Sequence, residues 1–145
     1  MNIVICGSLK FSHQMKEIAD SLIDKGFEVE IPWGAKKILD GTFDYDKFML
    51  EKERKGDAEF RKQSREDLII RYFDLIKHSD AILVANYKKG EIENYIGGNS
   101  FLEMGFAYVL GKKIYLLNPI PKMSYTDELI AMKPIVINGE LSKIK

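Results

Sequence analysis

Short runs of apolar residues alternate along this chain with longer segments in which apolar residues recur at helical spacing. Three runs of this kind lie at Ile3–Cys6, Ala81–Ala85 and Ile114–Leu117. They are too short for helices, and a strand without a polar face is typical of a parallel sheet that helices cover on both sides. The chain is therefore constrained to the α/β class.

The segments between these runs supply the covering helices and two further strands. Apolar residues recur at helical spacing after Ser12, the predicted N-cap, and Gly26 ends this helix. The alternating residues 27–31 predict a second strand that stops at Pro32. Further helices are predicted over 57–78, after Ser100 and over 125–132, with a last strand at 135–137. The pattern predicts a doubly wound, about five-stranded parallel sheet of the flavodoxin-like or Rossmann-like kind.

A polar, charged stretch from Trp33 to Gly56 interrupts this alternation. We expect it to form an excursion over the surface, with one short helix over residues 46–55. The length of 145 residues suits one domain that spans 1–145, and no second domain is needed.

Composition excludes several classes of partner. Lysine plus arginine and aspartate plus glutamate number 22 each, so no overall field favours nucleic acid or a membrane surface. The apolar run at the amino terminus is too short for a signal peptide or a membrane span, and we expect a cytoplasmic protein. The single cysteine, Cys6, is expected in the core, and no Cys/His spacing indicates a metal site.

Polar residues and glycines follow the apolar runs, where the carboxyl ends of parallel strands meet and where such sheets bind ligands. Gly7, Ser8 and Lys10 follow the first run, and together they can cradle a phosphate through backbone amides, a hydroxyl and a positive charge. The alternative is a glycine turn that only serves packing. The ends of the other runs carry Asn86, Tyr87 and Asn118.

The turn at Gly97, Gly98, Asn99 and Ser100 leads to Glu103, which we expect in the first turn of a helix. A glutamate at this edge of the sheet is a candidate nucleophile facing a pocket. Ser100 and Glu103 also have the spacing of a capping box, in which both side chains only satisfy helix amides. Both interpretations are open at this point.

Several segments together resemble the nucleoside 2-deoxyribosyltransferase superfamily, which includes base-exchanging transferases and hydrolases of deoxynucleoside 5′-monophosphates. The resemblance implies that Glu103, in Glu-x-Gly-x-Ala, is the catalytic nucleophile. It also implies that Gly7-Ser8-Leu9-Lys10 contacts a phosphate, with lysine where the hydrolases have arginine. It covers most of the chain and rests on Gly7–Lys10, Ser79–Val84, Phe101–Ala107 and Gly111–Ile114.

The chain departs from this family at two positions that are usually acidic or polar. Gly97 stands where the transferases have an aspartate and the hydrolases a serine, and Tyr72 stands where a second aspartate is found. Asp74 lies half a turn from Tyr72. The segment from Tyr87 to Ile96 is longer than the family's connection. The residues that remain as replacements are Asn86, Asn99 and Ser100.

The resemblance implies cleavage or transfer at the N-glycosidic bond of a 2′-deoxynucleoside or its 5′-monophosphate. Glu103 would attack C1′, and water or a second base would resolve the covalent intermediate with net retention. Trp33 and Tyr87 are candidates to stack on the base, and His13 could reach the site. No metal or organic cofactor is required. The alternative is a catalytically inactive nucleotide-binding sensor or regulatory protein.

Large apolar rings on two predicted helices suggest self-association. We expect a homodimer or a dimer of dimers in which a neighbouring subunit closes the pocket, as the resemblance also implies. The alternative is that the rings all fit one core. They are Phe60, Tyr72, Phe73, Phe106 and Tyr108.

Overall fold

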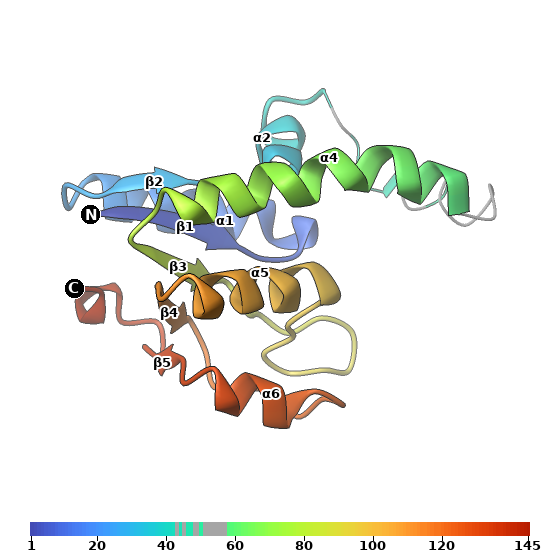
Figure 1. Ribbon diagram of the computed structural model, residues 1–145. Coiled ribbons are helices and arrows are strands. Elements are labelled where there is room, and N and C mark those ends of the chain that lie inside the picture. The colour runs from blue at the N-terminus through green and yellow to red at the C-terminus, as the bar shows by residue number, and fades with distance from the viewer. Residues whose placement is uncertain (43, 45, 48–49, 51–57) are drawn as a thin grey trace.

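The computed structural model describes residues 1–42, 44, 46–47, 50 and 58–145, and for 58–67 it describes the backbone alone. Within these residues five strands form one sheet in the order β2-β1-β3-β4-β5, and every neighbouring pair is parallel (Figure 1). The predicted parallel α/β fold is confirmed. The strands are β1 (Asn2–Cys6), β2 (Glu28–Glu30), β3 (Ala81–Val84), β4 (Lys113–Leu116) and β5 (Ile135–Val136).

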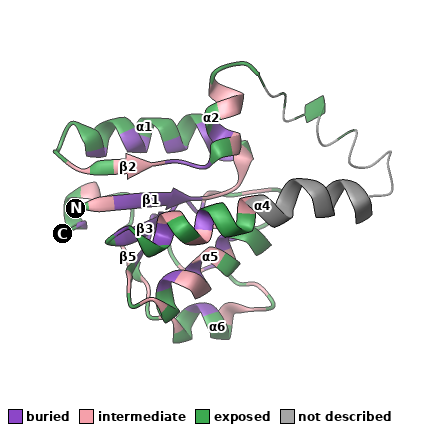
Figure 2. Ribbon diagram, turned by 45° about the horizontal axis from the view of Figure 1, so that its top comes forward, coloured by how far each residue is buried: buried purple, intermediate pink, exposed green. Residues whose placement is uncertain are grey.

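Helices cover both faces of this sheet, so the doubly wound arrangement is confirmed as well (Figures 1 and 2). One layer holds α1, α2 and the carboxyl-terminal segment, and the other holds α4, α5 and α6. The described helices are α1 (Ser12–Ile23), α2 (Trp33–Leu39), α4 (Ala58–Lys77), α5 (Gly98–Val109) and α6 (Thr126–Ala131). Two short 3-10 helices, η1 (Leu9–Phe11) and η2 (Leu141–Lys143), lie after β1 and near the carboxyl terminus.

The side chains of β1 alternate between the two cores. Ile3 and Ile5 pack in the core under α1, whereas Val4 and Cys6 pack in the core under α4 and α5. All four are at most 1% exposed. A strand buried on both faces needs an apolar residue at every position, which explains why the first run has no polar face.

The order of the strands reverses direction between β1 and β3. Loops from such neighbours diverge to opposite faces of the sheet and leave a crevice at the carboxyl ends of the strands. Cys6 pairs with Val84 in the register of β1 and β3, and the Ala85 N–H donates to the Cys6 carbonyl at 2.8 Å. Residues that follow β1 and β3 therefore lie next to each other.

Gly7 is required where β1 ends because the chain is crowded there. A Cβ atom at Gly7 would lie 3.0 Å from the Met15 sulfur and 3.3 Å from the Ala85 carbonyl oxygen. This packing of α1 and β3 against the backbone of Gly7 brings the turn after β1 close to the end of β3.

Two local predictions differ from the structure. Ser12 is the first helical residue of α1 and donates its hydroxyl to the Leu9 carbonyl, while the capping role belongs to Ser8 at the start of η1. The predicted surface excursion begins with α2, whose Ala35 is fully buried, so its first residues belong to the packed fold. Most of the short helix predicted over 46–55 lies outside the described residues. No helix in the described part of the chain has the length and apolarity needed to cross a bilayer.

Candidate functional site

The turn after β1 presents a hydroxyl at the carboxyl edge of the sheet. Ser8 caps η1, and its Oγ accepts a hydrogen bond from the Lys10 backbone N–H at 3.4 Å. Gly7 and Ser8 are partly buried, whereas the Lys10 side chain is exposed. Gly7 and Ser8 therefore form a turn with Lys10 exposed beside it, and the binding of a phosphate there stays a prediction.

A second lysine reaches this turn from the loop between β3 and α5. The Lys89 ammonium donates to Ser8 Oγ at 3.0 Å and lies 5.1 Å from the centre of the Tyr95 ring. The loop folds back on itself through a bridge between Lys89 and Ile92 and a hydrogen bond from the Tyr95 N–H to the Tyr87 carbonyl at 2.9 Å. It lies beyond the right-hand edge of the sheet in Figure 1.

Lys89 was not among the site residues predicted from the sequence. The unusual length of the segment from Tyr87 to Ile96 was the available signal, because a longer loop at this edge can fold back over the neighbouring turn. What the sequence did not show is which of the two adjacent lysines would point inward. Lys88 is exposed and pairs with Glu93 at 3.3 Å.

Helix α5 begins earlier than predicted, and this changes the position of Glu103. Gly97 is the N-cap, with extended backbone angles and no side-chain capping bond, and Gly98 is the first helical residue. Glu103 therefore lies in the second turn, and the first turn contains no acidic residue. The predicted capping box with Ser100 is wrong, because both residues lie inside the helix. Ser100 is buried at 4% exposure.

Glu103 is partly buried and lies near Cys6, the last residue of β1. Burial raises the pKa of Glu103 from 4.5 to about 7, and the neighbouring Cys6 acts more weakly in the opposite direction. A carboxyl group that titrates near neutral pH at a ligand-binding edge is a candidate for chemistry.

Tyr72 supports this corner from α4 and belongs to the core. It is 6% exposed, and its hydroxyl donates to the Ile5 carbonyl at 3.1 Å. Burial raises the pKa of Tyr72 well above its ordinary value, and the nearby Cys6 and Glu103 add to the effect. Asp74, half a turn away, lies in a different place. It lines a groove of about 500 Å³ with Asn2, from the amino end of β1, and His78.

Asn86 and Asn118 are brought together, and they bond to each other. The side-chain oxygen of Asn86 accepts from the Asn118 backbone N–H at 2.9 Å, and its amide donates to the Asn118 and Pro119 carbonyls at 3.0 and 3.1 Å. The Asn118 amide donates in return to the Asn86 carbonyl at 3.0 Å. Asn86 is fully buried, so this network ties the ends of β3 and β4 together.

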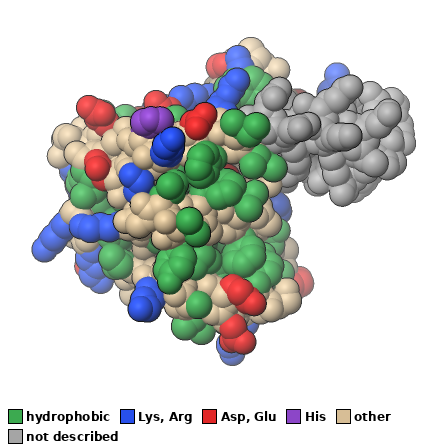
Figure 3. All heavy atoms as spheres, in the orientation of Figure 1, with side chains coloured by type: hydrophobic (Ala, Val, Ile, Leu, Met, Phe, Trp, Pro, Cys, Tyr) green, Lys and Arg blue, Asp and Glu red, His purple; other side chains and the backbone are tan. Residues whose placement is uncertain are grey.

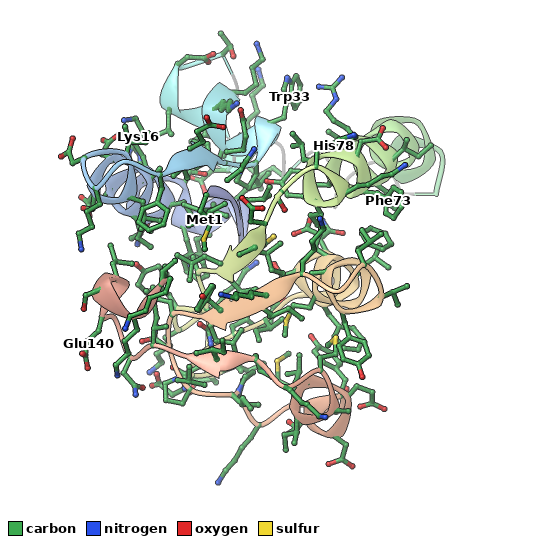
Figure 4. All side chains as sticks on the ribbon, turned by 60° about the vertical axis from the view of Figure 1, so that its left-hand side comes forward. Met1, Lys16, Trp33, Phe73, His78 and Glu140 are labelled. Carbon is green, nitrogen blue, oxygen red and sulfur yellow. The ribbon has the colours of Figure 1, made fainter. Side chains whose placement is uncertain are left out.

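The aromatic candidates lie on different sides of the turn after β1. Trp33 is 43% exposed between Lys37 of α2 and Arg71 of α4, whose charged groups lie 5.5 and 6.0 Å from its ring centre (Figure 4). Tyr87 is partly buried against Phe11, with ring centres 5.3 Å apart. The remaining candidates, Gly98, Asn99 and His13, are exposed.

A Cβ atom at Gly34 would lie 2.9 Å from the Leu9 side chain, so the start of α2 packs against η1. Trp33 therefore stands beside the turn that carries Ser8. Among the described residues, no group of three or more His, Cys, Asp or Glu side chains is arranged to hold a metal ion.

No model of a known protein family matches the chain, and no curated protein matches it significantly. Among solved structures, the chain is similar to the CMP N-glycosidase BcmB of Clostridium botulinum, with 17% identity and a TM-score of 0.47 over 95% of this chain and 90% of that one. A likeness of this extent concerns the course of the backbone and assigns no chemistry to the side chains.

The raised pKa of Glu103 predicts how the stability of the protein depends on pH. Below pH 4.5 the group is protonated in both the folded and the unfolded state, and stability then falls as the pH rises towards about 7, because the folded state resists ionisation. Glu103→Gln removes this cost. At alkaline pH we expect the variant to exceed the wild type by on the order of 2 kcal/mol, since each pKa unit corresponds to about 1.4 kcal/mol and partial exposure reduces the full effect.

Urea unfolding of both proteins at several pH values measures this difference. It should shrink towards zero at acid pH, and a difference that is constant across the range contradicts the raised pKa.

Proposed function

We propose that the protein cleaves or transfers the N-glycosidic bond of a 2′-deoxynucleoside or its 5′-monophosphate, with Glu103 as the nucleophile. The observation that carries the proposal is the partly buried Glu103, with its raised pKa, near Cys6 at the end of β1, two residues before Ser8. In this proposal the carboxylate and the turn at Ser8 act together at the carboxyl edge of β1 and β3. The resemblance of the sequence to the nucleoside 2-deoxyribosyltransferase superfamily supports the same assignment.

The chemistry follows from what a carboxylate can do at a sugar carbon. An oxygen of Glu103 attacks C1′, the bond from C1′ to the base nitrogen breaks, and its electron pair leaves with the base, which takes up a proton. Water or a second base then attacks C1′, loses a proton and releases the carboxylate. Two inversions give net retention. The nucleophile is the ionised form, so the pKa of about 7 predicts activity that rises with pH through neutrality.

The turn at Ser8 favours a substrate that carries a phosphate. A hydroxyl has two acceptor positions and one hydrogen. Ser8 Oγ accepts from Lys89 and from the Lys10 backbone N–H, so its own hydrogen is left to donate to an anion. Lys89 makes no ion pair with any described residue, in contrast to Lys88, and its charge is available to a phosphate.

A second candidate, a nucleotide-binding protein without turnover, is favoured by one observation. Tyr72, which stands where the family has its second aspartate, is a core residue whose hydroxyl donates to the Ile5 carbonyl. Gly97, at the other usually acidic position, has no side chain, and Asp74 lines a groove with residues of the amino end of β1. The two positions that are acidic in the family therefore supply no carboxyl group for protonating the base.

We also propose that two copies of the chain pair through α5 and α6. An apolar hollow of about 820 Å³ opens there, lined by residues such as Phe106 and Met132, and hydrophobic side chains gather over α4, α5 and α6 on this face (Figure 3). Val109 projects beside it with 84% exposure. A protruding apolar group next to an apolar hollow is self-complementary, which suits a two-fold interface.

The aromatic residues that the sequence suggested for self-association divide between this face and the core. Tyr72 is buried, Phe73 and Phe106 pack edge to face with centres 5.3 Å apart, and Tyr108 is 51% exposed. Figure 4 shows Phe73 on the side of α4 towards α5. The side chain of Phe60 lies outside the described residues.

Incubation with a panel of deoxynucleosides, nucleosides and their 5′-monophosphates, followed by chromatography for free base, tests the activity. We expect release of base from at least one 2′-deoxy compound, at a rate that falls as the pH drops below about 7. Glu103→Gln should lower this rate by more than about a thousandfold, because no nucleophile remains. Wild-type turnover by this variant contradicts the assignment of Glu103. Tight binding of a nucleotide without release of base supports the second candidate.

Calorimetry on lysine variants tests the phosphate site. Lys89→Ala should weaken binding of a nucleoside 5′-monophosphate by about tenfold or more, the value of one hydrogen bond to a charged group, and leave the matching nucleoside unaffected. Lys88→Ala is the matched control and should change neither. Lys10→Ala measures the contribution of the exposed lysine at the rim. If Lys89→Ala weakens the binding of nucleotide and nucleoside equally, the assignment of the phosphate site to this turn is wrong.

Light scattering at micromolar concentration tests the pairing of two copies. The wild type should have at least twice the 16.7 kDa mass of one chain. Val109→Glu should give the monomer, because it places a charge in an apolar interface. Ile23→Glu, at a 51% exposed position on α1 in the opposite layer, should leave the larger mass unchanged. A wild type with the mass of one chain would disprove the interface.

A further inference from the structure

The loop between β3 and α5 places the ring of Tyr95 against the side chain of Lys89. The Lys89 ammonium lies over this ring, 5.1 Å from its centre, and it donates to Ser8 Oγ at 3.0 Å. The same charged group is therefore in contact with an aromatic face and with the turn after β1. Lysine has a long side chain with several rotatable bonds, so each of these contacts restricts where the ammonium can lie.

The backbone that carries the Tyr95 ring is bonded to the residues just after β3. The Tyr95 N–H donates to the Tyr87 carbonyl at 2.9 Å, and the fully buried Asn86 donates its side-chain amide to the Asn94 carbonyl at 3.4 Å. Tyr95 itself is partly buried. The ring thus projects from a fixed segment of the loop and can restrain a more flexible neighbour.

Gly97 leaves free the space that the Tyr95 ring occupies. A Cβ atom at Gly97 would lie 3.1 Å from Tyr95 Cε1 and 3.1 Å from the Tyr95 hydroxyl oxygen, which is closer than ordinary van der Waals contact. The backbone angles of Gly97, φ −78° and ψ 173°, suit any residue, so the conformation itself does not require glycine. The ring of Tyr95 therefore explains why the N-cap of α5 has no side chain.

We propose that Tyr95 is a positioning residue whose ring holds the Lys89 ammonium beside Ser8 and so forms a fixed site for the phosphate of a nucleotide. The face of an aromatic ring attracts a cation. An ammonium has three hydrogens, and Ser8 Oγ accepts one of them, so the others can be donated to phosphate oxygens. The part of the phosphate rests on the proposed function, whereas the hold of the ring on Lys89 does not.

Proton NMR tests this hold without any ligand. Protons that lie over the face of an aromatic ring are shifted upfield, so the ε-methylene signal of Lys89 should lie upfield of that of the exposed Lys88. Lys89→Ala identifies the signal, because it then disappears. Tyr95→Leu should return the signal to the position of Lys88, and Tyr95→Phe, which keeps the ring, should retain the upfield shift. A Lys89 signal at the position of Lys88 in the wild type overturns the proposal.

Binding of inorganic phosphate, followed by NMR through the backbone amides of Gly7 and Ser8, tests the consequence for the anion site. Tyr95→Leu should weaken this binding about two- to fivefold, the value of a cation–π contact near the surface, and Tyr95→Phe should restore most of the affinity. In a Lys89→Ala background, Tyr95→Leu should cause no further loss, because the ring then has no ammonium to hold. The positioning role is overturned by equal losses with and without Lys89, or by equal losses in the leucine and phenylalanine variants.

These measurements separate this proposal from the proposed function. If no base is released from any nucleotide while phosphate binding depends on Tyr95 and Lys89 in this way, the proposed cleavage fails and the positioning role is supported. A wild type that binds no phosphate overturns both the phosphate site and the role of Tyr95 in it. Should Tyr95→Leu fail to fold, the Lys89 signals of the wild type and of Tyr95→Phe still decide the hold, because both proteins keep the ring.

Discussion

The pairing of β1 with β3 determines where every candidate residue lies. Both strands are buried on both faces, and their register places Cys6 opposite Val84 and Gly7 against Ala85. The chain leaves β1 towards α1 and leaves β3 towards α5, so the crevice between the two loops is a consequence of the strand order. Any change that shifts this register would separate the turn after β1 from the loop and helix after β3.

Glu103 and Tyr72 lie where the core packs closely, and burial makes the ionisation of both side chains costly. Glu103 is held against apolar neighbours, and its burial raises its pKa to about 7. The free energy that this desolvation costs is offset by the packing of β1 and α5 around it. A site of this kind is expected to be less stable than an all-apolar corner, which is why the same substitution is predicted to remove activity and to raise stability.

Predictions from local sequence patterns were wrong about where two helices begin and which residues cap them. Ser100 and Glu103 have capping-box spacing, but the helix already begins at Gly98, since Gly97 adopts the extended conformation of an N-cap. Ser12 likewise lies inside α1, because η1 precedes it and takes Ser8 as its cap. Boundaries of this kind depend on how the loop from the preceding strand arrives, and a pattern of spacing within the helix does not contain that information.

The sequence by itself determined the fold class, the parallel sheet and the edge of the sheet at which Glu103 and Ser8 lie, because apolar runs without a polar face can be buried in few ways. Only the tertiary structure decided the immediate neighbours of those residues. Lys89 donates to Ser8 although 81 residues separate them in the chain, and Cys6 of β1 packs against Met104 and Ala107 of α5. Such contacts depend on how a loop folds back and on how a helix is placed over a strand, and neither has a local periodicity that the sequence displays.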